Sequence, residues 1–394
     1  MHRIILAKHA VETLEFFSMQ MAETFQEAGM EVWFWDLEKP EESRKEFQIF
    51  YQKEETIFLT FNFIGLSEES QFEWTGHKSV WEIFEIPCYC IMVDSPIYYF
   101  KQLSSVHKHL TLLCIDKQHI KFVEEYYPKY GKVYFLPLGG TELSQNLPYN
   151  DRKYDVVFAG NYVALPNLMK HLKGVDEENK DFYFEIIQKL KEEPNLPLEQ
   201  TMISYLKKEI PKITRHEILA CLYGMVFVDL YIRSYFRREI VCSLAEAGIK
   251  VVVLGKDWEL SECKNMENLI MTGQIDSKTC LEYMNNAKIS LNVMPWFKEG
   301  AHDRIFNSML QGCVSVSDTS EYITEKLTDG QDYISFSLEQ RQELPKKIKK
   351  LLSEPDYAEK IALQGSRKAV KEHTWKERAL TFLKIADRKN MKEI

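Results

Sequence analysis

The sequence predicts an α/β protein with two Rossmann-like domains. Apolar strands alternate with helices through residues 1–150, and the same alternation resumes after residue 234. The chain has 394 residues, enough for two domains, and its 45% hydrophobic and 13% aromatic content can fill large cores. Strands that are separated by helices form parallel sheets with helices on both faces.

The first domain, residues 1–150, contains six predicted strands and four predicted helices. The strands cover residues 3–7, 31–35, 56–61, 87–93, 110–115 and 132–136. The helices cover residues 11–28, 41–52, 79–85 and 118–126. Ligands bind at the carboxyl ends of parallel strands. We therefore expect the ligand-binding edge of this domain at the residues that follow the strands: Lys8, His9, Asn62, Asp94, Ser95, Gly139 and Gly140.

The second domain, residues 151–372, follows a turn-rich polar linker at 146–152 and starts with a strand at 154–159. A charged, mostly helical stretch that three prolines interrupt predicts a helical insertion at about 165–227. Further strands are predicted at 250–254, 269–272, 289–294, 313–316 and 333–336. Further helices are predicted at 234–247, 277–286, 342–352, 357–371 and 376–388.

Residues 299–316, EGAHDRIFNSMLQGCVSV, carry the strongest functional signal. A strand leads through a loop into a short helix, predicted to begin near Ala301, with His302, Asp303 and Arg304 at its start. Asp303 is the expected cap of this helix. Free N–H groups and the positive end of a helix favour an anion, so the segment predicts a site for a phosphorylated ligand.

This segment resembles the nucleotide-sugar-binding segment of GT-B glycosyltransferases. The closer match is the spore-maturation-protein-like (glycosyl transferases group 1) family. In these enzymes an acidic residue is followed two helical turns later by a second acidic residue and then by a small-residue run ending in Gly. Glu299 and Gly312 match that pattern, whereas Asn307 stands at the second acidic position. An amide hydrogen-bonds a ribose hydroxyl but carries no charge.

Other segments agree in order with the same family. Gly160 and Asn161 end a strand where the family lines the donor diphosphate, and Gly255-Lys256-Asp257-Trp258 matches its strand-Gly-x-x-Trp segment. Gly273 and Gln274 resemble the loop that packs on the donor base. The ending, residues 373–394, resembles the family's last helix, which returns to the first domain. The resemblance implies two domains that face each other across a cleft holding the site.

The resemblance also assigns roles. Gly160, Lys256 and Arg304 would hold the diphosphate, together with one basic residue among Arg233, Arg237 and Arg238. Glu299 and Asn307 would orient the donor sugar and ribose. Apart from the resemblance, Trp296 and Phe297 sit beside Glu299, and their aromatic rings suit either the wall of a base pocket or the core. The full set of expected donor-binding residues is Gly160, Asn161, Arg237, Gly255, Lys256, Trp296, Glu299, His302, Arg304 and Asn307.

Two residues of the first domain are candidates for catalysis. Asp94 follows a strand in the sequence Met92-Val93-Asp94-Ser95-Pro96, and a positioned carboxylate serves as a general base on an acceptor hydroxyl. The same residues also suit an Asx-turn that leads into Pro96. His9 is the second candidate. The chain has no Asp-x-Asp tract at a strand end, so we expect metal-independent transfer without a cofactor.

Composition and motifs exclude several other classes of protein. A net charge of −9 argues against nonspecific binding to nucleic acid or to anionic membranes. The sequence has neither a G-x-G-x-x-G fingerprint nor a P-loop, which disfavours a dinucleotide oxidoreductase or a nucleoside triphosphatase. The eight cysteines lack zinc spacing and are expected to be buried free thiols in a reducing cytoplasm.

The N-terminal apolar run is too short for a signal peptide, and no apolar run reaches about 18 residues. We therefore expect a cytoplasmic enzyme without an integral membrane segment, whose partners are a nucleotide sugar and an acceptor protein or glycan. Two alternatives stay open. One is a degenerate nucleotide-sugar binder, suggested by Asn307, and the other is a nucleotide-sugar epimerase on the same fold.

Overall fold

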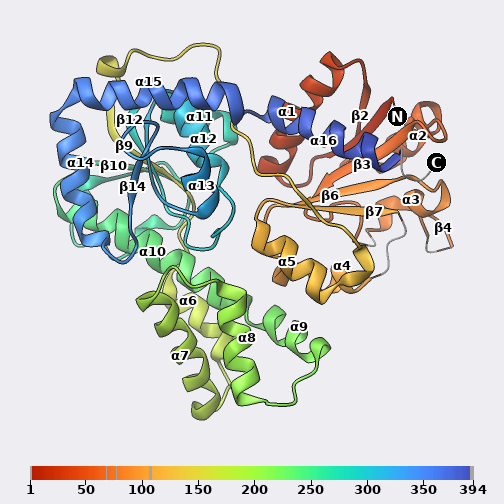
Figure 1. Ribbon diagram of the computed structural model, residues 1–394, viewed down its shortest axis with the longest axis horizontal. Helices are drawn as coiled ribbons and strands as arrows, with labels where there is room; N and C mark the ends of the chain where they lie inside the picture. Colours follow the sequence, from red (N-terminus) through yellow and green to blue (C-terminus); the bar gives the residue numbers. More distant parts are fainter. Residues whose placement is uncertain (1, 68, 77, 106–108, 391–394) are drawn as a thin grey trace. The chain divides into compact units, whose positions relative to one another are not determined.

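The computed structural model describes residues 2–67, 69–76, 78–105 and 109–390. The chain forms two compact units (Figure 1). Unit 1 comprises Met1–Gly139 and Thr374–Ile394, and unit 2 comprises Gly140–His373. Each unit is built around one six-stranded sheet in which all the paired strands are parallel.

Unit 1 has the strand order β2-β1-β3-β6-β7-β8. Its strands are β1 (Arg3–Lys8), β2 (Glu31–Asp36), β3 (Thr56–Phe61), β6 (Cys88–Met92), β7 (Leu110–Cys114) and β8 (Tyr134–Phe135). Its helices before the last segment are α1 (Glu12–Glu27), α2 (Pro40–Phe50), α3 (Val80–Ile83), α4 (Phe100–Ser104) and α5 (Lys117–Tyr126). A two-stranded antiparallel pair that the sequence did not predict is formed by β4 (Glu73–Thr75) and β5 (Lys78–Ser79).

The central strands of unit 1 are buried on both faces, as expected where helices cover both faces of a sheet. Every residue of β3 is buried, and so is every residue of β6 and β7. An aromatic cluster fills one side of the sheet, where the rings of Phe58 and Trp81 stack with their centres 3.9 Å apart. This packing fixes the direction of the strands and therefore the position of the residues that follow them.

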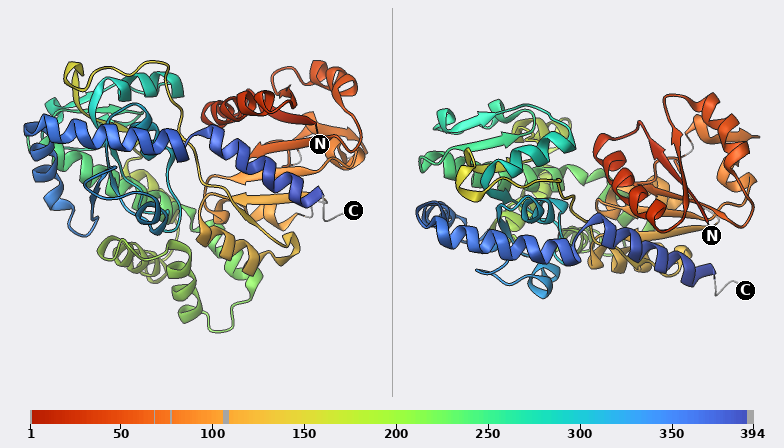
Figure 2. Two further views of the ribbon diagram at one scale, coloured as in Figure 1. Left: turned by 45° about the horizontal axis from the view of Figure 1, so that its top comes forward. Right: turned by 90° about the horizontal axis from the view of Figure 1, so that it is seen from above.

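The last helix, α16 (Trp375–Asn390), completes unit 1 by packing against α1 (Figures 1 and 2). The ring of Trp375 lies 4.5 Å from that of Phe17, and the ring of Phe382 lies 5.7 Å from that of Phe25. The core of unit 1 thus depends on residues from both ends of the chain.

Unit 2 has the strand order β11-β10-β9-β12-β13-β14. Its strands are β9 (Tyr154–Ala159), β10 (Val251–Leu254), β11 (Leu269–Met271), β12 (Ala287–Asn292), β13 (Val314–Asp318) and β14 (Ile334–Phe336). Its helices outside the insertion are α10 (Val226–Glu246), α11 (Ser277–Asn285), α12 (Asp303–Leu310), α13 (Glu321–Lys326), α14 (Leu344–Ser353) and α15 (Pro355–Glu372). The sequence did not predict α13.

The helical insertion lies between β9 and α10 and forms a bundle of its own within unit 2 (Figures 1 and 2). It contains α6 (Leu165–Met169), α7 (Glu177–Glu192), α8 (Leu198–Glu209) and α9 (Arg215–Gly224). The predicted start of the next helix at residue 234 was wrong, because α10 begins at Val226 and runs unbroken for 21 residues. Its first turns continue the helix because Phe227, Val228 and Ile232 are buried where α10 meets α6 and α7.

The predicted linker at 146–152 packs on unit 2. Asn146 Nδ2 donates to the Leu310 carbonyl oxygen at 2.9 Å, and the buried Arg152 donates to the carbonyl oxygens of Gln311 and Ala287 at 2.8 and 2.9 Å. The units therefore divide between Gly139 and Gly140 and again between His373 and Thr374, whereas the sequence placed these boundaries after residues 150 and 372.

The expectation that all cysteines are free thiols was wrong. Cys242 on α10 and Cys263 form a disulfide with their Cα atoms 5.2 Å apart. The two residues are 21 positions apart in sequence, and only the packing of the loop after β10 on α10 brings them together. Cys88, Cys90, Cys114 and Cys313 are buried free thiols, as expected.

Among the described helices, no single one is long and apolar enough to cross a membrane, although α9 and α10 together, bent by 43°, meet the length and composition criteria.

Candidate active site

The carboxyl ends of β9 and β10 meet through two glycines. Gly160 N–H donates to the Leu254 carbonyl oxygen at 2.9 Å, and a Cβ atom on Gly255 would lie 2.5 Å from the Gly160 carbonyl oxygen. Only glycine allows this approach. Trp258 Nε1 donates to the same carbonyl at 2.8 Å, and the Lys256 N–H donates to Asn161 Oδ1 at 3.0 Å. The predicted residues Gly160, Asn161, Gly255 and Lys256 thus lie together, in the two loops that follow β9 and β10.

Helix α10 carries three arginines, and the structure separates them. Arg237 Nη1 donates to the Asn161 carbonyl oxygen at 3.0 Å, and its guanidinium carbon lies 5.2 Å from the centre of the Trp296 ring. Arg233 lies 4.3 Å from the centre of that ring and pairs with the buried Asp229 at 2.7 Å. Arg238 instead donates to the Ser261 carbonyl oxygen at 2.6 Å. Arg233 and Arg237 therefore lie beside Trp296, whereas Arg238 holds the loop after β10.

The start of α12 holds a chain of buried polar groups. His302 is the N-cap residue, so the expectation that Asp303 caps the helix was wrong. His302 Nδ1 lies 2.5 Å from Asp303 Oδ1 and 3.3 Å from the backbone nitrogen of Arg304. The shorter contact favours the tautomer with its proton on Nδ1, which donates to Asp303 instead of accepting from Arg304. His302 Nε2 then accepts from Arg304 Nη2 at 2.8 Å, and Arg304 Nη1 donates to Asn292 Oδ1 at 3.3 Å.

Electrostatic interactions keep these hydrogen-bonded side chains in one protonation state. Burial and the positive charge of Arg304 lower the pKa of His302 to about 4, against the opposite effect of Asp303, so the ring is neutral at pH 7. Burial raises the pKa of Asp303, but His302 and Arg304 outweigh it and lower this pKa below its ordinary value. Because His302 and Asp303 occupy the helix end, the positive charge available for an anion comes from the arginine side chains.

Asn307 takes part in the protein's own hydrogen bonds. Its Oδ1 accepts from the Thr141 N–H at 2.9 Å, and its Nδ2 donates to Asp303 Oδ2 at 2.9 Å. A carboxylate at position 307 would face Asp303 with a like charge, whereas the amide offers that carboxylate a donor. This is a physical reason for the departure from the family pattern. Glu299, the matched acidic residue, is buried in the loop that precedes α12.

The predicted donor residues form a continuous series of contacts in unit 2. Lys256 contacts Asn161, Asn161 contacts Arg237, and Arg237 lies against Trp296. The Trp296 and His302 rings are 6.2 Å apart, and His302 contacts Arg304. Residues that are up to 143 positions apart in sequence thus line the carboxyl ends of β9, β10 and β12 together. Trp296 Nε1 is buried without a hydrogen-bond partner among the described residues.

Asp318 interacts electrostatically with Arg304, and the sequence interpretation missed it. It ends β13, and its Oδ1 accepts from the Met294 N–H at 2.6 Å. Burial raises the pKa of Asp318 to about 7, although Lys298 and Arg304 act in the opposite direction. The signal was available, because Asp318 follows an apolar strand in the same way as Asn161 and Asp94.

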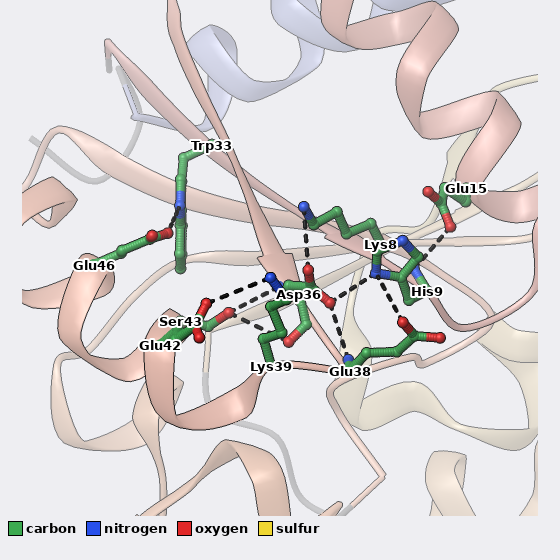
Figure 3. A network of polar contacts seen from close by, with 10 residues as sticks. All are labelled: Lys8, His9, Glu15, Trp33, Asp36, Glu38, Lys39, Glu42, Ser43 and Glu46. Carbon is green, nitrogen blue, oxygen red and sulfur yellow. Dashed lines mark hydrogen bonds and ion pairs between the residues drawn. The ribbon is translucent and has the colours of Figure 1, made fainter.

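In unit 1, His9 and Asp36 form a pair at the ends of β1 and β2. Figure 3 shows Lys8, His9 and Glu38 grouped around Asp36. His9 Nδ1 lies 2.7 Å from Asp36 Oδ1, Lys8 Nζ lies 3.3 Å from Oδ2, and the Glu38 N–H donates to Oδ1 at 3.0 Å. The hydrogen bond to Asp36 raises the pKa of His9. Burial raises the pKa of Asp36, but these hydrogen bonds outweigh it and lower the value to about 2.

The backbone also holds His9 in place. His9 has a φ of 61°, which residues other than glycine adopt rarely, and its N–H donates to Glu15 Oε2 at 2.7 Å. His9 lines a pocket of about 370 Å³. The other lining residues are Ala10, Glu12, Glu15, Phe16, Met19 and Glu38. Asp36 is the second residue that the sequence interpretation missed, although it directly follows a predicted strand.

Asp94, the other predicted catalytic residue, lies at the carboxyl end of β6 and is bound within unit 1. Its Oδ2 accepts from Asn62 Nδ2 at 3.1 Å and from the Tyr99 hydroxyl at 3.4 Å. Asn62 Oδ1 in turn accepts from the Val93 N–H at 2.9 Å. Asn62 and Asp94 thus link the ends of β3 and β6. No group of three or more His, Cys, Asp or Glu side chains among the described residues is arranged to hold a metal ion.

Comparisons with known proteins address the fold of the whole chain and the sequence of its second half. A family model described as glycosyl transferase-like matches residues 233–384. This range includes Arg237, Trp296, Glu299, Arg304 and Asn307. No curated protein matches the chain in sequence.

Several solved structures resemble the whole chain at 11% identity. Sucrose-phosphate synthase from Thermosynechococcus elongatus has a TM-score of 0.54, with 98% of this chain and 99% of that chain covered. HepE from Anabaena, in complex with UDP and glucose, has a TM-score of 0.54, with 98% and 100% covered. A glycosyltransferase from Rickettsia africae has a TM-score of 0.52, with 98% and 97% covered. These likenesses show the GT-B fold, and the predicted fold class is confirmed.

Asp318→Asn is expected to change how stability depends on pH. The carboxyl has an ordinary pKa of 3.8 and a folded-state pKa of about 7, so the folded state holds this proton more tightly than the unfolded state. Its contribution to stability is present at acidic pH and is lost as pH rises from about 4 to about 7, by up to about 4 kcal/mol. The amide does not ionise, and its oxygen still accepts from Met294.

Urea unfolding at about pH 5 and about pH 8 measures this effect, and the free energy of unfolding of the variant should rise relative to wild type at the higher pH. Asp356→Asn, at an exposed carboxyl of the same unit, is the matched control and should show no such change. If the free energy of unfolding of Asp318→Asn differs from that of wild type by the same amount at both pH values, the pKa of Asp318 is not raised.

Proposed function

We propose that this chain is a GT-B glycosyltransferase, which transfers a sugar from a nucleotide-diphosphate sugar to an acceptor hydroxyl of a protein or glycan. The observation that carries the proposal is the convergence of Arg233, Arg237 and Arg304 at the strand ends of unit 2, next to the turn of Gly160 and Gly255. The narrower likeness to the spore-maturation-protein-like group stays a prediction.

The arginines suit a departing diphosphate. Negative charge grows on the phosphate oxygen as the bond to the sugar breaks, and guanidinium groups held in place beforehand stabilise that charge. Arg233 and Arg304 are held by Asp229 and by Asn292 and His302, respectively, so they need little rearrangement. We infer that these side chains supply the stabilisation without a divalent metal.

The surrounding residues complete the donor site in this proposal. Gly160, where an added Cβ atom would lie 3.5 Å from the guanidinium carbon of Arg237, lets the backbone approach the diphosphate, with Lys256 beside it. Trp296 presents an indole N–H and an aromatic face to the nucleoside, and Glu299 orients the sugar. We assign Asn307 to the support of Asp303 because both of its polar atoms are engaged there. The HepE structure, which contains UDP and glucose, supports a nucleotide-sugar donor.

We propose His9 as the acceptor base and Asp36 as the residue that orients it. Asp36 contacts Nδ1, which leaves Nε2 available to take a proton from an acceptor hydroxyl. The side chain of His9 is 39% exposed and lines a pocket. Asp94 is the weaker choice because its carboxylate already accepts from Asn62 and Tyr99.

A thermal-shift panel of nucleoside diphosphates and nucleotide sugars tests the function. A ligand that binds the native state raises the unfolding midpoint, by an amount equivalent to about 2.7 kcal/mol at a hundredfold excess over its Kd. We expect one base to stabilise the protein and one sugar to add to that effect. The absence of any shift rules out the donor site.

A nucleotide-sugar binder without turnover is the second candidate, favoured by the engagement of Asn307 within the protein. The stabilising nucleotide sugar, incubated without acceptor, distinguishes the two. Slow release of free nucleoside diphosphate indicates a transferase that leaks to water. Complete recovery of the nucleotide sugar, with and without acceptors, indicates a binder, and a changed sugar in an intact nucleotide sugar indicates an epimerase.

Arg304→Ala is expected to raise the Kd for the nucleoside diphosphate by at least about tenfold, because a charge-assisted hydrogen bond is worth about 1.5–3 kcal/mol. Isothermal titration calorimetry measures this Kd, and circular dichroism checks the fold. Arg238→Ala is the matched control on α10, since Arg238 bonds Ser261 and lies outside the proposed site. Equal affinities of the two variants would contradict the placement of the diphosphate.

The pH profile of turnover tests His9 and Asp36. A base must be unprotonated, so kcat/KM should fall on the acid side as His9 gains a proton. Asp36→Asn removes the carboxylate that raises the pKa of His9, so the acid limb should move to lower pH. Glu38→Gln, which removes an exposed carboxylate 4.0 Å from His9, is the comparison and should move the limb less, because Glu38 makes the smallest contribution to the raised pKa of His9. An unchanged profile in both Asp36→Asn and His9→Gln excludes this pair from catalysis.

A further inference from the structure

Helices α14 and α15 carry a local charge opposite to that of the chain. Residues 344–372 contain eight Lys or Arg and four Asp or Glu, a net of +4 in a chain of net charge −9. Four of the lysines, at positions 346, 347, 349 and 350, lie on α14 and are all exposed. The apolar residues between them, Leu344, Ile348 and Leu351, are buried. The basic side chains therefore form the outer face of α14.

Helix α15 has an exposed stripe of mixed apolar and basic side chains. Tyr357, Leu363 and Val370 are 40%, 52% and 44% exposed. Lys360, Arg367 and Lys371 are exposed as well. These six residues recur every three or four positions, so they occupy one face of the helix. Large apolar side chains at this exposure, along one helical face, mark an interaction surface.

The two helices form one continuous surface. Lys350 Nζ near the end of α14 lies 5.9 Å from the centre of the Tyr357 ring at the start of α15. The figures place α14 and α15 next to each other in unit 2 (Figures 1 and 2). The lysines of α14 therefore continue into the stripe of α15.

We propose that the α14–α15 surface, defined by these four lysines and six stripe residues, binds an anionic lipid bilayer at its interface. Basic side chains are attracted to anionic headgroups, while Leu and Val side chains enter the boundary between headgroups and acyl chains. A soluble polyanion would use the cations but not Leu363 and Val370. A second copy of the chain would bring like charges together, which disfavours self-association through this face.

This surface also has a consequence for the site. The inner face of α15 packs on α12 and β13, which carry Arg304 and Asp318. The approach is close, since a Cβ atom on Gly365 would lie 3.4 Å from the Met309 methyl group and 2.3 Å from the Asp332 carbonyl oxygen. Docking of α15 thus fixes the orientation of unit 2 relative to the bilayer.

Vesicle co-sedimentation of the full chain tests the proposal. Vesicles of phosphatidylcholine alone are compared with vesicles containing about one third phosphatidylglycerol, at about 0.1 M salt. Wild type should partition at least about tenfold more strongly onto the anionic vesicles. Two variants should each partition at least about fivefold more weakly than wild type onto the anionic vesicles. In one variant the four lysines of α14 are changed to Gln, and the other carries Leu363→Ser with Val370→Ser.

A matched control uses exposed residues of the same kinds in the helical insertion. Lys207, Lys208 and Lys212 are changed to Gln, together with Ile210→Ser. The control should bind like wild type. The proposal fails if wild type does not prefer anionic vesicles, or if the control loses as much as the two variants. It also fails if only the lysine variant loses binding, since that result indicates attachment by charge alone, as to a soluble polyanion.

Discussion

The parallel direction of all strands within each six-stranded sheet is the constraint on which the rest of the structure depends. Parallel strands end at the same edge of a sheet, so the residues that follow them meet even when they are far apart in the chain. In unit 2 this brings Gly160, Gly255 and Asn292 to one edge. In unit 1 it does the same for His9 and Asp36, and for Asn62 and Asp94.

The arginines at the strand ends of unit 2 need negative charges close to them. Asp229 pairs with Arg233, while Asp303 and Asp318 lower the cost of burying Arg304. The neutral His302 separates Asp303 from Arg304 without adding a charge. Asn307 fits this arrangement because it donates to Asp303, whereas an acidic residue would add a like charge. The departure from the family pattern is therefore compatible with the anion site that we propose.

Local charge matters more than net charge for the outer surface. The net charge of −9 led the sequence interpretation to disfavour anionic membranes. Helices α14 and α15 nevertheless gather a positive face, because their buried sides are apolar and seven of their eight basic residues are exposed. A total over the whole chain does not describe an interface that extends over two helices, since charges beyond about one Debye length are screened.

The sequence by itself determined the α/β class, the order of strands and helices, and the segments that supply the donor-site candidates. Strands such as β3 and β9 coincide with their predicted ranges because their apolar runs are uninterrupted and local. Gly255 was identifiable for the same reason, as a glycine that directly follows an apolar strand.

Only the tertiary structure decided which of these candidates meet. Arg233, Arg237 and Arg238 are equivalent in sequence, and the packing of α10 turns two toward Trp296 and one toward Ser261. The pairing of Asp36 with His9, the Cys242–Cys263 disulfide and the pKa of Asp318 were also beyond prediction. Each depends on partners or burial supplied by distant segments, and local sequence patterns carry no information about such contacts.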